Sequence, residues 1–452
     1  MFKSMALGLL MVWLMPVTLA PTPPSALKGG VAKVEVTPGF GLAMYGYANR
    51  TQPSNGLLDP LYARVLALEA GETRIALVTL DLGRVFRKSW IDQLRETVRK
   101  TSKVSYVLVN ASHTHSGPAL QDDCSTKPGP AWETSALDKI AKAIDEAYQR
   151  LVPVQLGTGY GTSYIGHNRL RVNADGMAVW FERNLTKIPT SPVDPTVSVL
   201  RFDAADGKPL AVLVNYACHP VVFGRDNLQY SADYPGVMMR TVEQAFDGAP
   251  LCFFLPGAAG DINPYFAVTP LEEDAVKMRD WTGEQLGQAA IRVAKNIKTQ
   301  AAAEANLDFS EDLLPARLRW NAEKIREGLT KSRGRQAADE YVSCLKPEFQ
   351  LPVTTVLINK QIALMGMPGE PFVEFQMNWR ARCPVRDAFF LGYTNGSFGY
   401  FPTIQSTTRG GYGAANLSTQ VEVGTGERMV DYALIKVYKM LGRLSDLPEG
   451  LR

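Results

Sequence analysis

An apolar run, Val104-Ser-Tyr-Val-Leu-Val109, is followed directly by the polar segment Asn110-Ala-Ser-His-Thr-His-Ser-Gly-Pro118. This junction of a strand-like run with a histidine-containing loop is the most informative feature for the fold. A short run rich in valine, leucine and tyrosine that ends in turn residues is typical of a buried β-strand. In an extended segment, residues i and i+2 point to the same side, so the rings of His113 and His115 can face one cavity. Neutral imidazoles in such a place are suited to bind a metal ion, although two ordinary polar loop residues are the alternative.

Similar apolar runs recur along the chain, and helical patterns separate them. The runs are Val31–Val36, Tyr62–Glu69, Arg74–Leu80, Val104–Asn110, Val197–Phe202, Leu210–Ala217, Leu251–Leu255, Val353–Met365 and Phe389–Tyr393. The helical patterns are Ser89–Thr101, Ser135–Arg150, Glu272–Ile297, Ala322–Tyr341 and Glu427–Leu441. This alternation predicts an α/β (mixed α+β) fold, with a large mixed β-sheet core flanked by helices. We expect one large domain, in which only a small helical excursion near residues 310–350 is a candidate for a separable unit.

Polar loops with chemically useful side chains follow several of these runs. His219 comes after Leu210–Val214 in Asn215-Tyr-Ala-Cys-His-Pro220, and Glu370 follows the run that ends near Met367. The carboxyl ends of strands in open α/β sheets are where ligands and catalytic groups gather. We therefore predict a His/Glu metal site at the C-terminal ends of strands. Ordinary structural roles are the alternatives: a core residue for His219, a helix N-terminus for Glu370, a turn for Asp261, and core packing for Tyr400 and Tyr412.

The composition argues against several classes of protein. The chain has 452 residues, of which 46% are hydrophobic and 21% charged, and this is ordinary for a globular protein. Its formal net charge of +3 comes without a dense cluster of lysine and arginine, so nucleic acid is a poor candidate partner. The motifs G-x-S-x-G, H-E-x-x-H, G-x-G-x-x-G and the Walker loop are absent, so the mechanisms that they mark have no support here.

The first twenty residues read as a targeting segment. Lys3 gives a positive start, Met5 to Val17 is an uncharged apolar run, and Thr18-Leu19-Ala20 supplies a rough small-residue exit. We predict a signal peptide at 1–20 and an exported protein, periplasmic or secreted. The run is short for a membrane span, although a retained N-terminal anchor is the alternative.

Five cysteines occur without any C-x-x-C spacing, so a structural cysteine–zinc site is not expected. Cys218 and Cys252 lie in strand-like runs and are predicted to be small core residues. One disulfide, such as Cys344 with Cys383, is compatible with an exported protein, but the sequence does not assign it.

The string His113-Thr-His-Ser-Gly-Pro118 resembles the signature of the neutral/alkaline, non-lysosomal ceramidase family. Further matches to that family follow in the right order along nearly all of the chain after its N-terminal segment. They are Lys33–Pro38, Tyr45–Tyr47, Leu61–Arg64, Asp81–Gly83, His167–Arg169, His219, Ser231–Asp233, Gly260–Pro264, Pro368–Glu370, Asn395–Tyr400 and Tyr412. One such match would be weak, but this many in sequence order is specific.

The resemblance implies a zinc ion with four protein ligands. Carried over residue by residue, these ligands are His113, His219, Glu370 and Tyr400. The residues implied beside the substrate carbonyl are His115, which would also protonate the leaving amine, Tyr412 and Arg169. By the same resemblance the chain is a zinc-dependent amidohydrolase that cleaves the amide bond of an N-acylated compound, with ceramide the leading candidate. A zinc hydrolase of another amide or an ester and, less favoured, a non-catalytic metal-binding protein of the same fold are the alternatives.

Two departures from the family pattern bear on the substrate. The family carries serine in its Gly-Asp-x-Ser-Pro loop, where this chain has Asn263, which can orient a neighbour by hydrogen bonds but cannot act as a nucleophile. We expect residues 28–452 to form a ceramidase-like catalytic domain, without the immunoglobulin-like C-terminal domain of typical ceramidases. The expected partner is a small-molecule or lipid amide substrate. Peripheral contact with a membrane and the oligomeric state stay open.

Overall fold

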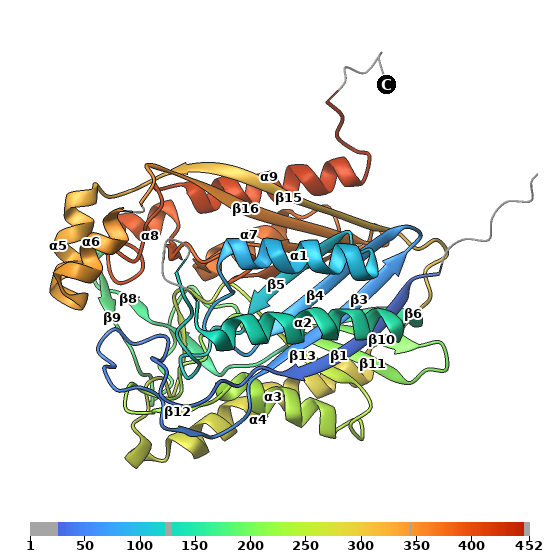
Figure 1. Ribbon diagram of the computed structural model, residues 1–452, viewed down its shortest axis with the longest axis horizontal. Helices are drawn as coiled ribbons and strands as arrows, with labels where there is room; N and C mark the ends of the chain where they lie inside the picture. Colours follow the sequence, from blue (N-terminus) through green and yellow to red (C-terminus); the bar gives the residue numbers. More distant parts are fainter. Residues whose placement is uncertain (1–25, 123–128, 344, 447–452) are drawn as a thin grey trace, which may run out of the picture.

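Two packed β-sheets, covered by helices on both outer faces, make up the fold (Figure 1). The computed structural model describes residues 26–122, 129–343 and 345–446. The predicted signal peptide at 1–20 and the cysteines Cys124 and Cys344 lie outside these described residues. The mixed fold class, with a large mixed sheet flanked by helices, is confirmed.

The larger sheet has eight strands. In spatial order they are β13 (Leu251–Pro256), β11 (Pro209–Tyr216), β10 (Thr196–Ala204), β6 (Val152–Thr162), β1 (Lys28–Glu35), β3 (Tyr62–Ala70), β4 (Thr73–Leu80) and β5 (Tyr106–Ala111). The outermost pairs, β11 with β13 and β4 with β5, are parallel, and the inner pairs are antiparallel. Twist of about 20–25° per strand pair accumulates across the sheet, and its two edge strands, β5 and β13, come back into contact. The sheet is therefore strongly curled.

The smaller sheet packs face to face on the larger one. Its four strands are, in order, β15 (Leu307–Arg317), β16 (Glu348–Ile358), β17 (Ile362–Gly366) and β19 (Asp387–Leu391). Alternation along β5 shows how the layers form: Tyr106 and Leu108 join the core between the sheets, whereas Val107 and Val109 face the helices. The apolar run that predicted β5 is continuous because both faces of this strand are buried.

Helices cover the outer face of each sheet (Figure 1). The larger sheet is covered by α1 (Lys88–Ser102), α2 (Ala131–Gln149), α3 (Asp233–Gln244) and α4 (Ala275–Asn296). The smaller sheet is covered by α7 (Val373–Arg382) and α9 (Thr425–Met440), while α5 (Ala322–Arg333) and α6 (Arg335–Ser343) leave the body between β15 and β16. Among the described residues, none of the helices combines the length and the apolar character that crossing a bilayer requires.

Short elements line the loops between the long ones. They are β2 (Gly56–Leu57), β7 (Gly166–Asn168), β8 (Leu170–Val172), β9 (Ala178–Trp180), β12 (Gln229–Tyr230), β14 (Ile262–Pro264), η1 (Leu271–Glu273), β18 (Glu370–Pro371), β20 (Tyr400–Phe401) and α8 (Ile404–Arg409).

Several predicted elements needed correction. The single run Val353–Met365 is a hairpin of β16 and β17, since Asn359 and Lys360 both take the positive φ values of a tight turn. The predicted helical excursion near 310–350 is wrong for its first part, which belongs to strand β15. Strand β6 was missed because glycines interrupt its apolar pattern. These glycines leave room for α4, whose side chains would collide with added Cβ atoms.

A turn at Gly392–Asn395, directly after β19, joins the two edges of the larger sheet. The carbonyl oxygen of Tyr393 accepts a hydrogen bond from the backbone N–H of Ala111 in β5, at 3.2 Å. The N–H of Gly392 donates to the carbonyl oxygen of Pro256 at the end of β13, at 3.0 Å. The turn therefore holds the carboxyl ends of β5 and β13 together.

Two buried asparagines attach the histidine loops to the same place. Asn110 in β5 donates its Nδ2 to the carbonyl oxygen of Gly392 at 2.6 Å. Asn215 in β11 donates its Nδ2 to the carbonyl oxygens of Phe390, at 2.8 Å, and Leu255, at 2.9 Å. Each asparagine precedes a histidine by only three or four residues, so the end of β19 fixes where both histidine loops begin.

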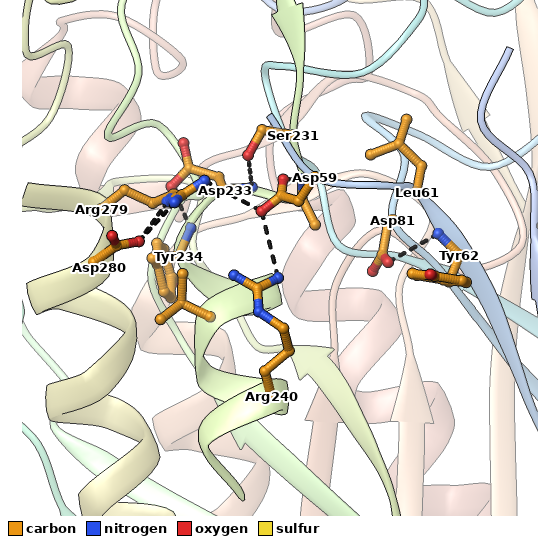
Figure 2. A network of polar contacts seen from close by, with 12 residues as sticks. Asp59, Leu61, Tyr62, Asp81, Ser231, Asp233, Tyr234, Arg240, Arg279 and Asp280 are labelled. Atoms are coloured by element: carbon orange, nitrogen blue, oxygen red, sulfur yellow. Dashed lines mark hydrogen bonds and ion pairs between the residues drawn. The ribbon is translucent and has the colours of Figure 1, made fainter. Parts of the chain in front are cut away.

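A buried polar network anchors α3 and α4 to the loop before β3 (Figure 2). Asp59 Oδ1 lies 3.2 Å from Arg279 Nη1 of α4 and 3.4 Å from Arg240 Nη1 of α3. Its Oδ2 accepts a hydrogen bond from the N–H of Ala232 at 2.9 Å. The network thereby fixes the Ser231–Asp233 loop, one of the segments that matched the family, and gives it a structural role.

Replacing Asp59 with alanine should lower the free energy of unfolding by about 1–3 kcal/mol, because the buried guanidinium of Arg279 would lose one of its two carboxylate partners and keep only Asp280. Denaturant unfolding measures this change. Arg326→Gln, which breaks the exposed pair of Arg326 with Asp339, is the control and should leave stability nearly unchanged. Equal midpoints for Asp59→Ala and the wild-type chain would contradict a stabilising role for this network.

Candidate metal centre

His113 and His115 leave the end of β5 with their rings turned toward one centre. Their Nε2 atoms lie 3.4 Å apart. The backbone of His113 is left-handed, with a φ of 69°, and its N–H donates to the carbonyl oxygen of Leu82 at 2.9 Å. The two rings converge as predicted, but the extended backbone assumed for the pair is wrong at His113. A left-handed residue is uncommon outside glycine, and here it redirects the chain so that the rings meet.

His219 and Glu370 complete the inner part of the cluster. Glu370 Oε2 lies 3.2 Å from Nε2 of His113 and 3.2 Å from Nε2 of His219. Ligands about 2.0–2.1 Å from a tetrahedral zinc ion are separated by about 3.3 Å, so these three side chains have the spacing of a metal site. The three histidines alone also form a group whose ring nitrogens could hold a metal ion.

The second ring nitrogen distinguishes two of the three histidines from the third. Nδ1 of His113 lies 2.7 Å from the carbonyl oxygen of Gly83, and Nδ1 of His219 lies 2.5 Å from that of Ala259. A backbone carbonyl can only accept, so both Nδ1 atoms carry the proton and both Nε2 lone pairs face the centre. Nδ1 of His115 is buried and has no hydrogen-bond partner in the part of the chain that the structure describes.

Tyr400 reaches the centre through a short strand pairing. Strands β18 and β20 are parallel and place Glu370 opposite Tyr400. The Tyr400 hydroxyl accepts a hydrogen bond from Arg169 Nη2 at 2.9 Å. Tyr412 lies at the outer rim: its ring centroid is 5.5 Å from that of Tyr400, and 45% of its surface is exposed.

Arg169 is buried and connects Tyr400 to the loop that carries Asn263. Its Nη2 donates to the carbonyl oxygen of Gly260 at 2.6 Å, and its Nη1 donates to Asn263 Oδ1 at 3.1 Å. Asn263 in turn donates its Nδ2 to the carbonyl oxygen of Glu182 at 3.0 Å. Protein groups thus bond both the oxygen and the nitrogen of the Asn263 side-chain amide, and Asn263 helps to hold Arg169 in place.

Burial sets the protonation of the cluster. It lowers the pKa of His219 to about 3 and holds the pKa of His115 well below its ordinary value, with neighbouring imidazoles adding to the effect on His115. Burial by itself would raise the pKa of Glu370, but His113 and His219 outweigh it and hold that pKa well below its ordinary value. At neutral pH the imidazoles of His115 and His219 are therefore neutral beside one carboxylate, and imidazole nitrogens together with a carboxylate are donors that a zinc ion takes.

Residues 28–267 match the family model described as neutral/alkaline non-lysosomal ceramidase, N-terminal. The chain belongs to this family. A solved structure of a neutral ceramidase from Pseudomonas aeruginosa superposes with a TM-score of 0.73 at 18% sequence identity, over 94% of this chain and 76% of that one. A structure described as ceramidase complexed with C2 gives a TM-score of 0.72 with the same identity and coverage. At this identity the two structures are similar in fold, and membership of the family suggests a hydrolase.

The structure brings together every residue that the sequence predicted for the site. They are His113, His115, Arg169, His219, Asn263, Glu370, Tyr400 and Tyr412. The fourth histidine, His167, lies outside the cluster, where its Nε2 contacts the carbonyl oxygen of Phe181 at 2.8 Å. Of the cysteines, Cys218 and Cys252 are buried in the core as predicted. Cys383 has no disulfide partner among the described residues, and the pairing with Cys344, which the sequence left unassigned, concerns a residue outside them.

Sequence reasoning gave no role to the residues that enclose His115. Rings of Tyr45 and Tyr47 lie edge-on to it, with centroids 5.7 and 5.0 Å away. Arg50 Nη1 donates to the carbonyl oxygen of His115 at 2.8 Å. Gly46 has a φ of 108°, and a Cβ there would lie 2.3 Å from Cγ of His115, so only glycine fits. The Tyr-Gly-Tyr spacing was the available signal, but contacts across 65 residues are invisible in a local pattern.

Proposed function

We propose that this chain is an exported, zinc-dependent amidohydrolase that cleaves N-acylated compounds, with ceramide the leading candidate substrate. The observation that carries the proposal is the approach of one oxygen of Glu370 to Nε2 of both His113 and His219. Family membership supports hydrolysis of a lipid amide, and the ceramidase complexed with C2 supports it further.

The donor set fits a zinc ion held by His113, His219, Glu370 and Tyr400. Two imidazoles whose Nδ1 atoms are hydrogen-bonded to backbone carbonyls, a carboxylate and a phenol are oxygen and nitrogen ligands of the kind zinc accepts. Burial holds the pKa of Tyr400 well above its ordinary value, and Arg169 beside the hydroxyl acts in the opposite direction, toward the charged form. When bound, zinc would polarise the substrate carbonyl and lower the pKa of a water molecule to about 7.

The remaining side chains would handle the substrate and the proton. Tyr412 and His115 would donate hydrogen bonds to the oxygen that gains charge, where losing one donor typically lowers the rate about 10²–10³-fold. Arg169 would keep Tyr400 in place. His115 is the best placed to carry a proton from the attacking water to the leaving amine, because no protein group among the described residues fixes the proton on its Nδ1.

Glu370→Gln and His219→Ala should each abolish tight zinc binding and amide hydrolysis together. His115→Ala should keep the zinc and lower kcat about 10²–10³-fold, because it removes a donor and not a ligand. His167→Gln is the matched control, since that histidine lies outside the cluster and should change neither quantity.

Elemental analysis and hydrolysis of a lipid-amide and acyl-amino-acid panel measure these effects. Purified wild-type chain, prepared without chelator, should hold about one zinc ion. Protein without any bound transition metal would refute the proposal. Equal loss of zinc from the His115→Ala and His113→Ala variants would reverse the roles assigned to the two histidines.

Asn263 bears on which amide is cleaved. A serine would be too short to reach Arg169 as the asparagine does, and it would leave a hydroxyl available near the centre. Asn263→Ser should therefore shift the ratio of kcat/KM for ceramide over a non-sphingolipid amide toward ceramide by about tenfold. Asn263→Ala, which adds no hydroxyl, should weaken both reactions without this shift. An unchanged ratio in Asn263→Ser would mean that this position does not set specificity.

Export is proposed from Lys3 and the uncharged run Met5 to Val17. Cell fractionation followed by N-terminal sequencing should find the protein outside the cytoplasm with its first residues removed. A variant lacking residues 2–20 is the control and should stay in the cytosol. Full-length, untrimmed wild-type protein in the cytosolic fraction would refute export.

A further inference from the structure

Tyr393 lies directly against the candidate metal centre, although nothing in the proposed chemistry uses it. Its ring is stacked on that of His113, with a centroid distance of 4.2 Å and an interplanar angle of 23°. Its ring edge meets His219 at a centroid distance of 6.3 Å. Tyr393 is only 3% exposed, so both proposed histidine ligands pack against a buried phenol.

The backbone holds Tyr393 in this place at an energetic cost. Its φ is 54°, a left-handed conformation that is uncommon for an aromatic residue. The N–H of Tyr393 donates to the carbonyl oxygen of Gly369 at 2.8 Å, and its own carbonyl oxygen is bound by Ala111. Asn395 pins the same turn by bonding both the N–H and the carbonyl oxygen of Val109, at 2.8 and 2.9 Å. Such over-determined strain is found most often at functional sites.

The packing of the Tyr393 ring does not explain why the residue carries a hydroxyl. It is buried, and it has no hydrogen-bond partner within the described residues. A buried hydroxyl without a partner destabilises a protein, and phenylalanine would give the same stacking without that loss. A phenol hydroxyl is both a donor and an acceptor of hydrogen bonds, so this one is available to a group that the described residues do not supply.

We propose that Tyr393 is an additional positioning residue of this centre. Its ring holds the plane of the His113 imidazole, and its hydroxyl donates a hydrogen bond to an oxygen acceptor that enters with the metal ion or with the substrate. This inference rests on the proposed function, since it requires a metal ion at the centre. Hydrogen bonds behind the ligands of a metal orient them and raise its affinity, and losing one typically lowers metal affinity about 10–100-fold.

The test uses the purified full chain with two substitutions. Tyr393→Phe removes only the hydroxyl, and Tyr393→Leu removes the stacked ring as well. The measurements are the melting temperature of the metal-free protein, the zinc affinity by competition with a chelator, and kcat and KM for amide hydrolysis. Tyr148→Phe is the matched control, because Tyr148 on the buried face of α2 is a tyrosine remote from the centre, with its hydroxyl 3.5 Å from the carbonyl oxygen of Leu68.

Tyr393→Phe should melt at the same temperature as wild type or higher, and yet lose about tenfold or more in zinc affinity or in kcat. A loss in zinc affinity without substrate indicates an acceptor that comes with the metal ion, and a loss in kcat alone indicates one that comes with the substrate. Tyr393→Leu should lose zinc affinity about 10–100-fold, because the imidazole of His113 is no longer held in plane. The control should change neither zinc affinity nor kcat.

Unchanged zinc affinity, kcat and KM in Tyr393→Phe would overturn the role of the hydroxyl. A fall in melting temperature that accompanies the loss of function would overturn it too, because it would reveal an ordinary structural hydrogen bond. Wild-type zinc affinity in Tyr393→Leu would overturn the role of the ring. Absence of zinc binding by the wild-type chain is a different outcome, which removes the proposed function and this inference with it.

Discussion

The closure of the curled eight-stranded sheet by the end of β19 is the constraint on which the rest of the structure depends. Strands β5 and β11 lie far apart in the strand order of the larger sheet, and the pairings of the strands between them make the two run in opposite directions. Twist brings the edges of the sheet together, and the turn at Gly392–Asn395 then bonds to both of them. Asn110 and Asn215 add side-chain bonds to the same strand end. Without these hydrogen bonds to the end of β19, nothing described here would hold the two histidine loops next to each other.

Once the loops meet, the physical chemistry of burial limits what they can contain. A charged imidazole without counter-charge would be expensive in such a site, and burial keeps His219 neutral. The Nε2 lone pairs of His113 and His219 face the centre because the backbone carbonyls of Gly83 and Ala259 hold the proton on Nδ1 of each ring. The carboxylate of Glu370 lies between the imidazoles of His113 and His219, and a bound cation would stabilise this arrangement. The same rigid scaffold tolerates left-handed backbone at His113 and Tyr393.

Local sequence patterns predicted the fold class, most long strands and the histidines at strand ends, because burial on both faces of a strand produces a continuous apolar run. They could not place Glu370 beside Tyr400, since that contact depends on a two-residue pairing of β18 with β20. The family resemblance supplied that pair. Neither source indicated Tyr393, whose Gly-Tyr-Thr-Asn-Gly context reads as an ordinary turn. Its position against His113 follows from the sheet closure, which is a long-range property.

The proposed metal centre is tested most directly by finding out which protein atoms coordinate a bound zinc ion. Zinc K-edge X-ray absorption spectroscopy on the purified, zinc-loaded full chain would report it directly. We expect nitrogen and oxygen ligands only, at about 2.0–2.1 Å, with the scattering of two imidazole rings from His113 and His219. A third imidazole would make His115 a ligand, and a sulfur ligand at about 2.3 Å would place the metal elsewhere. Either result would contradict the assignment of this centre.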